Sequence, residues 1–299
     1  MKIFVTGAAG FIGGSVAMRL LSLGHEILGL VRKDDAANRL AQSGIEPVMG
    51  TLDDSDLLIK LARSSDAVIN AANADHLGSV QALLDGLKGS GKPLLHTSGS
   101  SVVGDDARGG WCSADVFDEQ TPLVINPFKQ ARRDIDCLVL AGVNDGVRTA
   151  VICPSLIYGV GKGLNPLSVQ IPFLASNALE KGVVEIVGKG LNVWSNVHID
   201  DVASLYQLVL EKGPGGGFYF VENGEASYVE LATALARRLG LPGVEHLEPE
   251  KAAERWGVAR AYFSFGSNSR VRARRAREEL DWKPEHASVI EWISDEMPS

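Results

Sequence analysis

Three glycines near the amino terminus constrain the fold of this chain more than any other feature. They belong to the segment Thr6-Gly7-Ala8-Ala9-Gly10-Phe11-Ile12-Gly13, which follows an apolar run and precedes apolar residues at helical spacing. In a strand–turn–helix unit, such glycines permit a sharp turn, a close approach of the backbone to a pyrophosphate, and tight packing of helix on strand. The helix N-terminus then favours phosphate through its free N–H groups and its dipole. We therefore expect a dinucleotide to contact Gly7, Gly10, Phe11, Ile12 and Gly13; the plainer alternative is a turn without a ligand.

Short apolar runs alternate with helical patterns through the first half of the chain. The runs lie at residues 3–5, 27–31, 47–49, 67–69, 94–95 and 149–152. Runs that are apolar at nearly every position are typical of parallel strands buried on both faces. The repeat of strand, helix and strand predicts an α/β fold of the Rossmann type, with a doubly wound parallel sheet and right-handed crossovers.

The second half of the chain is less regular. Glycine-rich connections at residues 159–163, 188–190 and 213–217 separate short elements. We expect residues 1–158 to form the cofactor-binding domain and residues 159–299 to form mainly a smaller C-terminal substrate lobe. A helix near residues 200–212 starts with two carboxylates, which favour a helix N-terminus, and we expect it to return to the first domain.

The end of the second strand indicates which cofactor binds. An enzyme that uses NAD commonly has an acidic residue there, which binds the ribose hydroxyls. This chain has Arg32 and Lys33 instead. A planar guanidinium binds phosphate well, so we expect Arg32 and Lys33 to contact the 2′-phosphate of NADP (NADPH), with NAD less favoured. The alternative is a pair of solvated surface cations.

Composition excludes several classes of protein. The 299 residues carry a formal charge of −8, and an acidic surface argues against binding to nucleic acid. No apolar run approaches the roughly 18 residues of a membrane span, and the chain opens directly on the first strand without a signal pattern, so we expect a cytoplasmic protein. The three cysteines are far apart and lack the spacing of a zinc site, so we expect no metal.

Further motifs extend this pattern along nearly the whole chain. They are Ala71-Ala72-Asn73, Thr97-Ser98-Gly99-Ser100-Ser101, Pro154-Ser155-Leu156-Ile157-Tyr158-Gly159, Val197-His198-Ile199-Asp200-Asp201 and Arg277-Glu278-Glu279-Leu280-Asp281-Trp282-Lys283-Pro284. With the glycine turn, this set resembles the short-chain dehydrogenase/reductase superfamily, in its extended and atypical branch of epimerase/dehydratase-like proteins. The resemblance implies a homodimer formed by helices near residues 76–88 and 128–140. It also implies further cofactor contacts from Leu52, Ala71, Ala72, Asn73, Thr97, Ser98, Arg132, Pro154 and Leu156.

The catalytic residues of that family are altered in this chain. The family uses a serine or threonine and a YxxxK pair, in which the tyrosine exchanges the substrate proton and the lysine holds the nicotinamide ribose. By position, Phe128 replaces the tyrosine and Arg132 the lysine. Phenylalanine has no exchangeable proton, and arginine stays protonated. We expect catalytic contributions from Arg132, from Ser100 near the usual serine position, and from Tyr158 as a substitute proton donor; purely structural roles are the alternative for the last two.

His198, with Asp200 and Asp201, suggests a metal or an acid–base site, but the family pattern favours a structural strand-to-helix junction. Three functions remain open. The leading one is an NADP(H)-dependent oxidoreductase that acts on a small carbonyl compound, alcohol or imine. The second is a regulator that binds NADP and senses its redox state without chemistry, which the loss of both the tyrosine and the lysine suggests. The third is a sugar-nucleotide epimerase or dehydratase, against which Arg32 and Phe128 both count.

Overall fold

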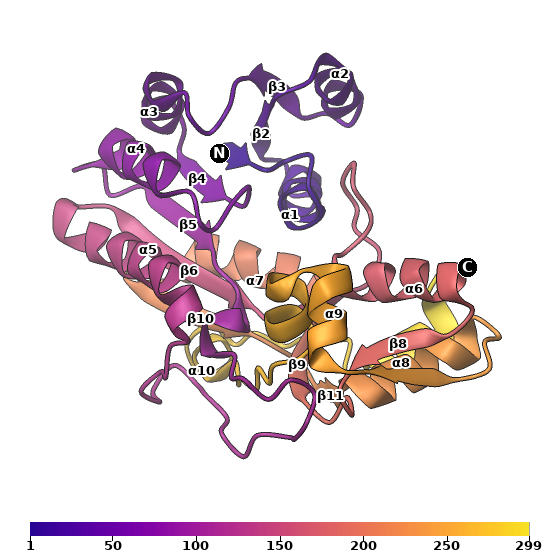
Figure 1. Cartoon of the computed structure of the whole chain (residues 1–299). Helices are drawn as coiled ribbons and strands as arrows, with labels where there is room; N and C mark the ends of the chain where they lie inside the picture. Colours follow the sequence, from indigo (N-terminus) through magenta and orange to yellow (C-terminus); the bar gives the residue numbers. More distant parts are fainter. Residues whose placement is uncertain (299) are drawn as a thin grey trace.

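A seven-stranded parallel sheet forms the centre of the molecule. The computed structural model describes residues 1–298, and its main sheet has the strand order β10-β6-β5-β4-β1-β2-β3 (Figure 1). This arrangement confirms the predicted Rossmann-type α/β fold. The strands are β1 (Lys2–Thr6), β2 (Glu26–Val31), β3 (Glu46–Met49), β4 (Ala67–Asn70), β5 (Pro93–Thr97), β6 (Arg148–Pro154) and β10 (Gly217–Val221).

Helices cover both faces of this sheet. On one face, α1 (Phe11–Ser22), α2 (Asp34–Gln42), α7 (Ile199–Lys212) and α10 (Arg274–Leu280) share one hydrophobic core with the strands. The other face packs against α3 (Ser55–Ser64), α4 (Leu77–Leu87) and α5 (Gln130–Ala141). The apolar strands predicted from the sequence are thus buried on both sides, as a parallel sheet requires.

A second core lies in the C-terminal lobe. It packs among a three-stranded sheet, a two-stranded sheet and several helices. The strands are β7 (Leu156–Tyr158), β9 (Val193–His198) and β11 (Glu225–Ser227) in one sheet, and β8 (Val184–Val187) and β12 (Val244–Leu247) in the other. The helical segments are α6 (Gln170–Lys181), α8 (Tyr228–Arg238), α9 (Pro249–Trp256), η4 (Ala259–Ser264), α11 (Val289–Glu291) and η5 (Trp292–Glu296).

The two parts of the chain interleave more than the sequence analysis expected. Helix α7 packs against α1, and α10 packs on β10. Strand β10 forms the seventh strand of the main sheet beside β6, and this return was not predicted. The buried Trp282, shortly after α10, connects this segment to α7, since its Nε1 donates hydrogen bonds to Asp201 O and Ser204 Oγ. Residues after 158 therefore build the sheet domain as well as the lobe.

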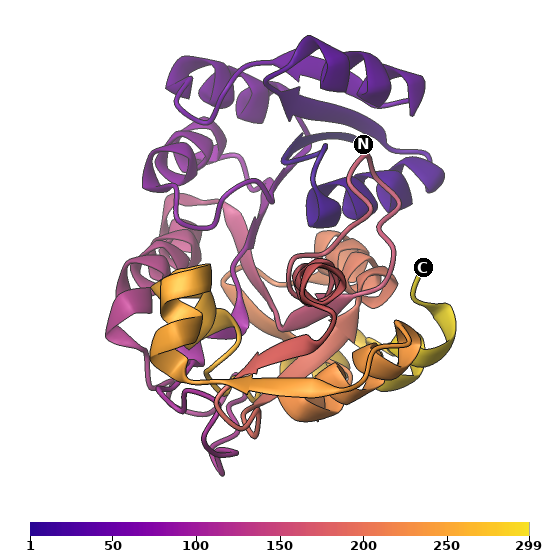
Figure 2. The same cartoon turned by 45° about the vertical axis from the view of Figure 1, so that its right-hand side comes forward.

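A long loop of residues 159–169, here called the finger loop, reaches from the lobe to the start of α1 (Figures 1 and 2). Its sides meet through a hydrogen bond from Gly161 N to Pro166 O. Three shorter helical segments, η1 (Ser100–Val103), η2 (Pro127–Lys129) and η3 (Gly142–Asp145), complete the connections. Within residues 1–298, no helix combines the length and the apolar character needed to cross a membrane.

Candidate cofactor and active site

A cavity of about 690 Å³ opens along the carboxyl ends of β1 to β4. In doubly wound sheets, ligands bind in the crevice at this edge. Eight of the predicted cofactor contacts line the cavity: Gly7, Gly10, Arg32, Lys33, Leu52, Ala71, Ala72 and Asn73. The other predicted contacts lie outside this lining.

Two glycines of the turn, Gly7 and Gly13, have no space for a side chain. Gly7 has a φ of 77°, and a Cβ on it would lie 2.7 Å from Ala71 O. A Cβ on Gly13 would lie 2.4 Å from Gly7 O, closer than real Cβ contacts. Helix α1 thus rests directly on the backbone of the turn. A hydrogen bond from Gly10 N to Gly7 O, 2.8 Å long, closes the turn.

The start of α1 is open to an anion. Its N-cap is Gly10, which offers no side chain to accept the first N–H groups, and no acidic residue lies in the first turn. Uncapped N–H groups and the positive end of the helix dipole together make a binding site for phosphate. The turn therefore fits a dinucleotide pyrophosphate.

Two exposed cations border the same cavity. Arg32 and Lys33 directly follow β2, and both side chains line the cavity. Among residues 1–298, neither forms an ion pair with a carboxylate (the salt bridges found elsewhere in the molecule do not include them). On the cavity wall that follows β3, Asp53 accepts a hydrogen bond from His76 at 3.2 Å. The end of the cavity near β2 can thus receive an additional phosphate.

The finger loop covers one side of the phosphate turn. Phe11 does not line the cavity; its ring contacts Gly161, where a Cβ would lie 2.7 Å from the ring. A Cβ on Gly163 would likewise lie only 2.6 Å from Gly14 Cα. Lys162 is fixed at both ends, because its backbone N donates to Ser15 Oγ and its Nζ pairs with Asp200 at 2.8 Å. The lobe is thereby attached beside the turn.

Arg132 bridges α5 and the loop after β4. Its Nε and Nη2 donate to the two carboxylate oxygens of Asp75 at 2.7 and 2.6 Å, and its Nη1 donates to Ser101 Oγ at 3.3 Å. The hydrogen bond from Arg132 lowers the pKa of Asp75. Most donors of Arg132 are therefore already engaged within the protein. Its predicted contact with the cofactor ribose has to use the remaining N–H groups.

Phe128 lies on η2, directly before α5. Its side chain is among the most exposed apolar groups, at 78%, and its ring packs on Phe263 of η4 with centroids 5.2 Å apart. Lys129 lies 5.7 Å from the same Phe263 ring. The Phe128 and Phe263 rings thus form an apolar surface, and the Phe128 ring has no exchangeable proton.

Two predicted cofactor residues at the carboxyl end of β5 direct their hydroxyls into the protein. Thr97 Oγ1 lies 2.5 Å from the hydroxyl of the buried Tyr206 on α7. Ser98 Oγ donates to Asp136 on α5 at 2.9 Å. Pro154 and Leu156 are likewise buried, in β6 and β7 respectively. Their side chains make no part of the cavity wall.

The placement of Tyr158 and Ser100 does not support their predicted catalytic roles. Tyr158 is 1% exposed within the lobe core, and its hydroxyl donates to His286 O. Burial also raises the pKa of Tyr158 far above its ordinary value, which opposes proton release. Ser100 is equally buried and lies 2.8 Å from Ser269 Oγ. For Tyr158 the sequence could not predict this, because the chain leaves the main sheet after β6.

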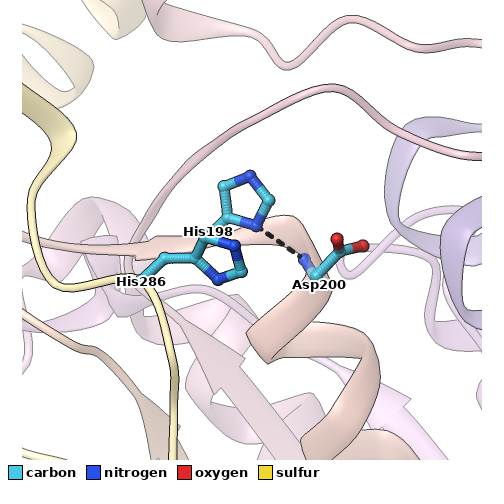
Figure 3. Close-up of side chains that lie close together, drawn as sticks. All are labelled: His198, Asp200 and His286. Atoms are coloured by element: carbon cyan, nitrogen blue, oxygen red, sulfur yellow. Dashed lines mark hydrogen bonds between the residues drawn. The ribbon is translucent and has the colours of Figure 1, made fainter. Parts of the chain in front are cut away.

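His198, Asp200 and His286 gather at the start of α7 (Figure 3). His198 Nδ1 accepts a hydrogen bond from Asp200 N and so caps the helix. The two imidazoles stack with centroids 3.8 Å apart and planes 22° from parallel. Ring nitrogens bind metals through lone pairs in the ring plane, and lone pairs of stacked rings do not converge on one ion. Asp200 is also paired with Lys162. The cluster serves the helix junction.

Several cavity residues were not found by sequence reasoning. Gly50, Thr51 and Asp53 follow β3 and face the cavity beside Leu52. His76 also lines the cavity, and it caps α4 through Nδ1, which accepts from Ser79 N. Their position directly after a parallel strand could have predicted them, since every loop that follows one of these strands reaches the same edge of the sheet.

The comparisons agree with this fold. The pattern of the NAD dependent epimerase/dehydratase family matches residues 3–221. Oxidase ucsJ of Acremonium sp is 36% identical over 322 residues, covering 95% of this chain and 92% of the relative. A 2-alkyl-3-oxoalkanoate reductase of Stenotrophomonas maltophilia is 29% identical and covers 86% and 82%. The structure of dTDP-glucose 4,6-dehydratase from Bacillus anthracis in complex with NAD superposes with a TM-score of 0.78 at 24% identity, covering 99% and 94%; this likeness shows the fold alone.

Proposed function

Because the chain belongs to the NAD-dependent epimerase/dehydratase family, we propose that it is an NADP(H)-dependent oxidoreductase acting on a small carbonyl compound, alcohol or imine. One observation carries the proposal. The uncapped glycine turn and two unpaired cations, Arg32 and Lys33, share one cavity within the described chain. This spacing of an anion site and a cationic end fits a dinucleotide with a third phosphate.

The preference for NADP rests on the residues after β2. A carboxylate there would bind the ribose hydroxyls of NAD and repel a 2′-phosphate. The side chain at this place is Arg32, whose planar donors match a phosphate. The dTDP-glucose dehydratase described above was solved with NAD, so NAD is the competing cofactor that an experiment has to exclude.

The division of work at the site follows from its residues. A bound nicotinamide would supply or accept the hydride, while the turn and Arg32 hold the phosphates. The ion pair of Arg132 and Asp75 joins α5 to the loop after β4, and the same loop carries Asn73 of the cavity wall. Phe128 and Phe263 supply an apolar surface for substrate. A reductase and an oxidase among the relatives support redox chemistry over epimerisation.

A second candidate function is a redox regulator that binds NADP without turnover. The observation in its favour is the engagement of Arg132 by Asp75 and Ser101, together with a phenylalanine in place of the proton donor. Both candidates require the same cofactor site and differ only in chemistry.

A turnover screen separates them. NADPH fluorescence would first establish binding, and NADPH absorbance would then be followed with aliphatic aldehydes, aromatic aldehydes, quinones and cyclic imines. An oxidoreductase consumes NADPH with at least one class, and consumption requires the protein. Tight NADPH binding with no consumption on the whole panel would support the regulator and contradict the proposed function.

A further inference from the structure

A chain of buried polar side chains lies behind the crevice and has no part in the site as described so far. Thr6, at the end of β1, donates to Asn70 Oδ1 of β4 at 2.6 Å. Asn70 Nδ2 lies 3.1 Å from His96 Nδ1 on β5. All three side chains are buried. Buried polar groups of this kind are costly unless they are paired, so their alignment across three neighbouring strands calls for a reason.

The hydrogen bonds fix the tautomer of His96. Asn70 uses its oxygen to accept from Thr6, so its amide nitrogen faces the imidazole and donates to Nδ1. A neutral imidazole that accepts at Nδ1 carries its proton on Nε2. Burial lowers the pKa of His96 to about 4, which keeps the ring neutral near pH 7. The Nε2–H group therefore acts as a fixed donor.

Asp136 lies opposite this donor. Its Oδ1 lies 3.9 Å from His96 Nε2, and both atoms are buried with no hydrogen-bond partner among the described residues. The separation is too long for a direct hydrogen bond, but short enough for the N–H dipole to act on the carboxyl group. The other oxygen, Oδ2, accepts from Ser98 Oγ at 2.9 Å. The carboxyl group thus stands between a buried imidazole and a hydroxyl.

The charges around Asp136 set its protonation. Burial raises the pKa of Asp136 to about 6, while the hydrogen bond from Ser98 and the positive charges of Arg133 and Arg132 act to lower it. Asp75 opposes the two arginines weakly. The thiol of the buried Cys153, on β6, stays protonated because burial raises its pKa. Near neutral pH, Asp136 can therefore hold a proton or release one.

Ser98 is the least buried member of this chain of groups. It directly follows β5, at the carboxyl edge of the sheet where ligands bind. Its 7% exposure is small, yet Thr6, Asn70, His96 and Asp136 are more deeply buried. Arg132 passes over the adjacent Gly99, where a Cβ would lie 3.4 Å from Nη1. Ser98 therefore lies at this edge of the sheet, next to the residue over which Arg132 passes on its way to Asp75.

We propose that Ser98 and Asp136 together supply the proton that Phe128 cannot give, with Ser98 as the catalytic residue and Asp136 as the buried group that stores the proton and positions Ser98. This inference rests on the proposed oxidoreductase function. The chain from Thr6 to His96 holds an N–H group toward the carboxylate that remains after proton release.

In carbonyl reduction, each proton moves toward the substrate: from Asp136 to Ser98, and from Ser98 to the carbonyl oxygen. A bound dihydronicotinamide would supply a hydride to the carbonyl carbon, and the π electron pair would then move to the carbonyl oxygen. That oxygen takes the proton of Ser98, and Ser98 Oγ takes the proton of the Asp136 carboxylic acid. Asp136 is left as a carboxylate, and water in the open crevice returns a proton through Ser98 after the product leaves. Alcohol oxidation reverses each transfer.

The first test needs no cofactor and no substrate. Carbon-13 NMR of labelled aspartate carboxyls would follow Asp136 through a pH titration of the free protein, with Asp136→Asn used to assign its signal. We expect an apparent pKa near 6. The Ser98→Ala variant loses the donor to Oδ2 and should raise that pKa further. Titration of Asp136 in the ordinary aspartate range, or no response to Ser98→Ala, would overturn the proposal.

The second test measures hydride transfer. Single-turnover oxidation of NADPH by 9,10-phenanthrenequinone and by 4-nitrobenzaldehyde would be compared between the wild type, Asp136→Asn and Ser98→Ala. The control is Asp134→Asn, an exposed residue of the same helix that hydrogen-bonds Gln130. Loss of a general acid slows transfer by about 10²- to 10⁴-fold, so both test variants should slow by that factor while the control does not.

The outcomes distinguish a failure of proton transfer through Asp136 and Ser98, here called the relay, from a failure of the proposed function. We expect the wild-type rate to fall as pH rises through about 6, and we expect Asp136→Asn to lose this dependence while its NADPH affinity is unchanged. Equal rates and pH profiles in the wild type and Asp136→Asn would overturn the relay and leave the function standing. A wild type that binds NADPH and reduces neither compound would overturn the function, and the catalytic use of Ser98 with it.

Discussion

Replacing Gly13 with alanine should damage both the fold and the cofactor site. The added Cβ would lie 2.4 Å from Gly7 O and 2.8 Å from Gly7 C. Both are backbone atoms of the turn and have no rotamer through which to move away. Either α1 moves outward, or the peptide after Gly7 rotates, and each response displaces the N–H groups that face the phosphates.

The size of the effect follows from opposing contributions. Overpacking of a tight contact costs about 1–3 kcal/mol. Exchanging glycine for alanine within a helix returns about 0.8–1 kcal/mol. We expect a net loss of up to about 2 kcal/mol in the free energy of unfolding. We further expect an NADPH affinity at least about tenfold weaker, which corresponds to about 1.4 kcal/mol.

A matched control comes from another helix. Gly78 lies in the first turn of α4, and a Cβ on it would meet only His76 Cε1, at 3.6 Å. The Gly78→Ala variant should therefore be neutral or more stable, by up to about 1 kcal/mol. Urea unfolding would measure stability and calorimetry would measure NADPH binding. If Gly13→Ala matched Gly78→Ala in both measurements, the described contact of α1 with the turn would be wrong.

Three further predictions concern side chains at the site and at the start of α7. Arg132→Lys keeps the charge but loses the paired hydrogen bonds, so the lowered pKa of Asp75 should rise in carboxyl NMR; an unchanged Asp75 titration would contradict the bridge. Burial and the neighbouring His286 lower the pKa of His198 to about 4, so between pH 6.5 and 4 the unfolded chain binds a proton that the folded chain does not. That difference removes roughly 3 kcal/mol of stability as pH falls through this window. The His198→Asn variant can still cap α7, so in urea unfolding it should lose less stability than the wild type between pH 7 and 5. An equal loss of stability in the two proteins would contradict the lowered pKa of His198. Phe128→Tyr should not speed single-turnover reduction of 9,10-phenanthrenequinone, because the exposed ring lies against Phe263, whereas a large gain would mean that the native site lacks a proton donor.

Local patterns in the sequence were sufficient to predict the sheet and the phosphate turn. The spacing of Gly7, Gly10 and Gly13 describes contacts within a few residues, and the apolar runs identify strands that are buried on both faces. Strand β10 escaped prediction because it pairs with β6 from a distant part of the chain. Nothing in its local sequence names that partner.

The chemistry of the site depends on contacts that no local pattern contains. Arg132 and Asp75 are far apart in sequence, and only the packing of α5 against β6 and α4 brings Arg132 to the loop after β4 that carries Asp75. His96 stands in an apolar strand and looks like an isolated polar residue until Asn70 and Asp136 surround it. Tyr158 was assigned to the crevice by its motif, but β7 leaves the main sheet and takes the ring into the lobe core.

The most direct test of the account is the cofactor preference of the cavity. Calorimetric titrations with NADPH and with NADH would compare the wild type, Arg32→Ala and a control, Arg63→Ala, which removes an exposed arginine of α3 outside the cavity. We predict that the wild type and the control bind NADPH more tightly than NADH, and that Arg32→Ala loses at least about tenfold of this preference, or about 1.4 kcal/mol. Absence of NADPH binding in the wild type, or an unchanged preference in Arg32→Ala, would contradict the account.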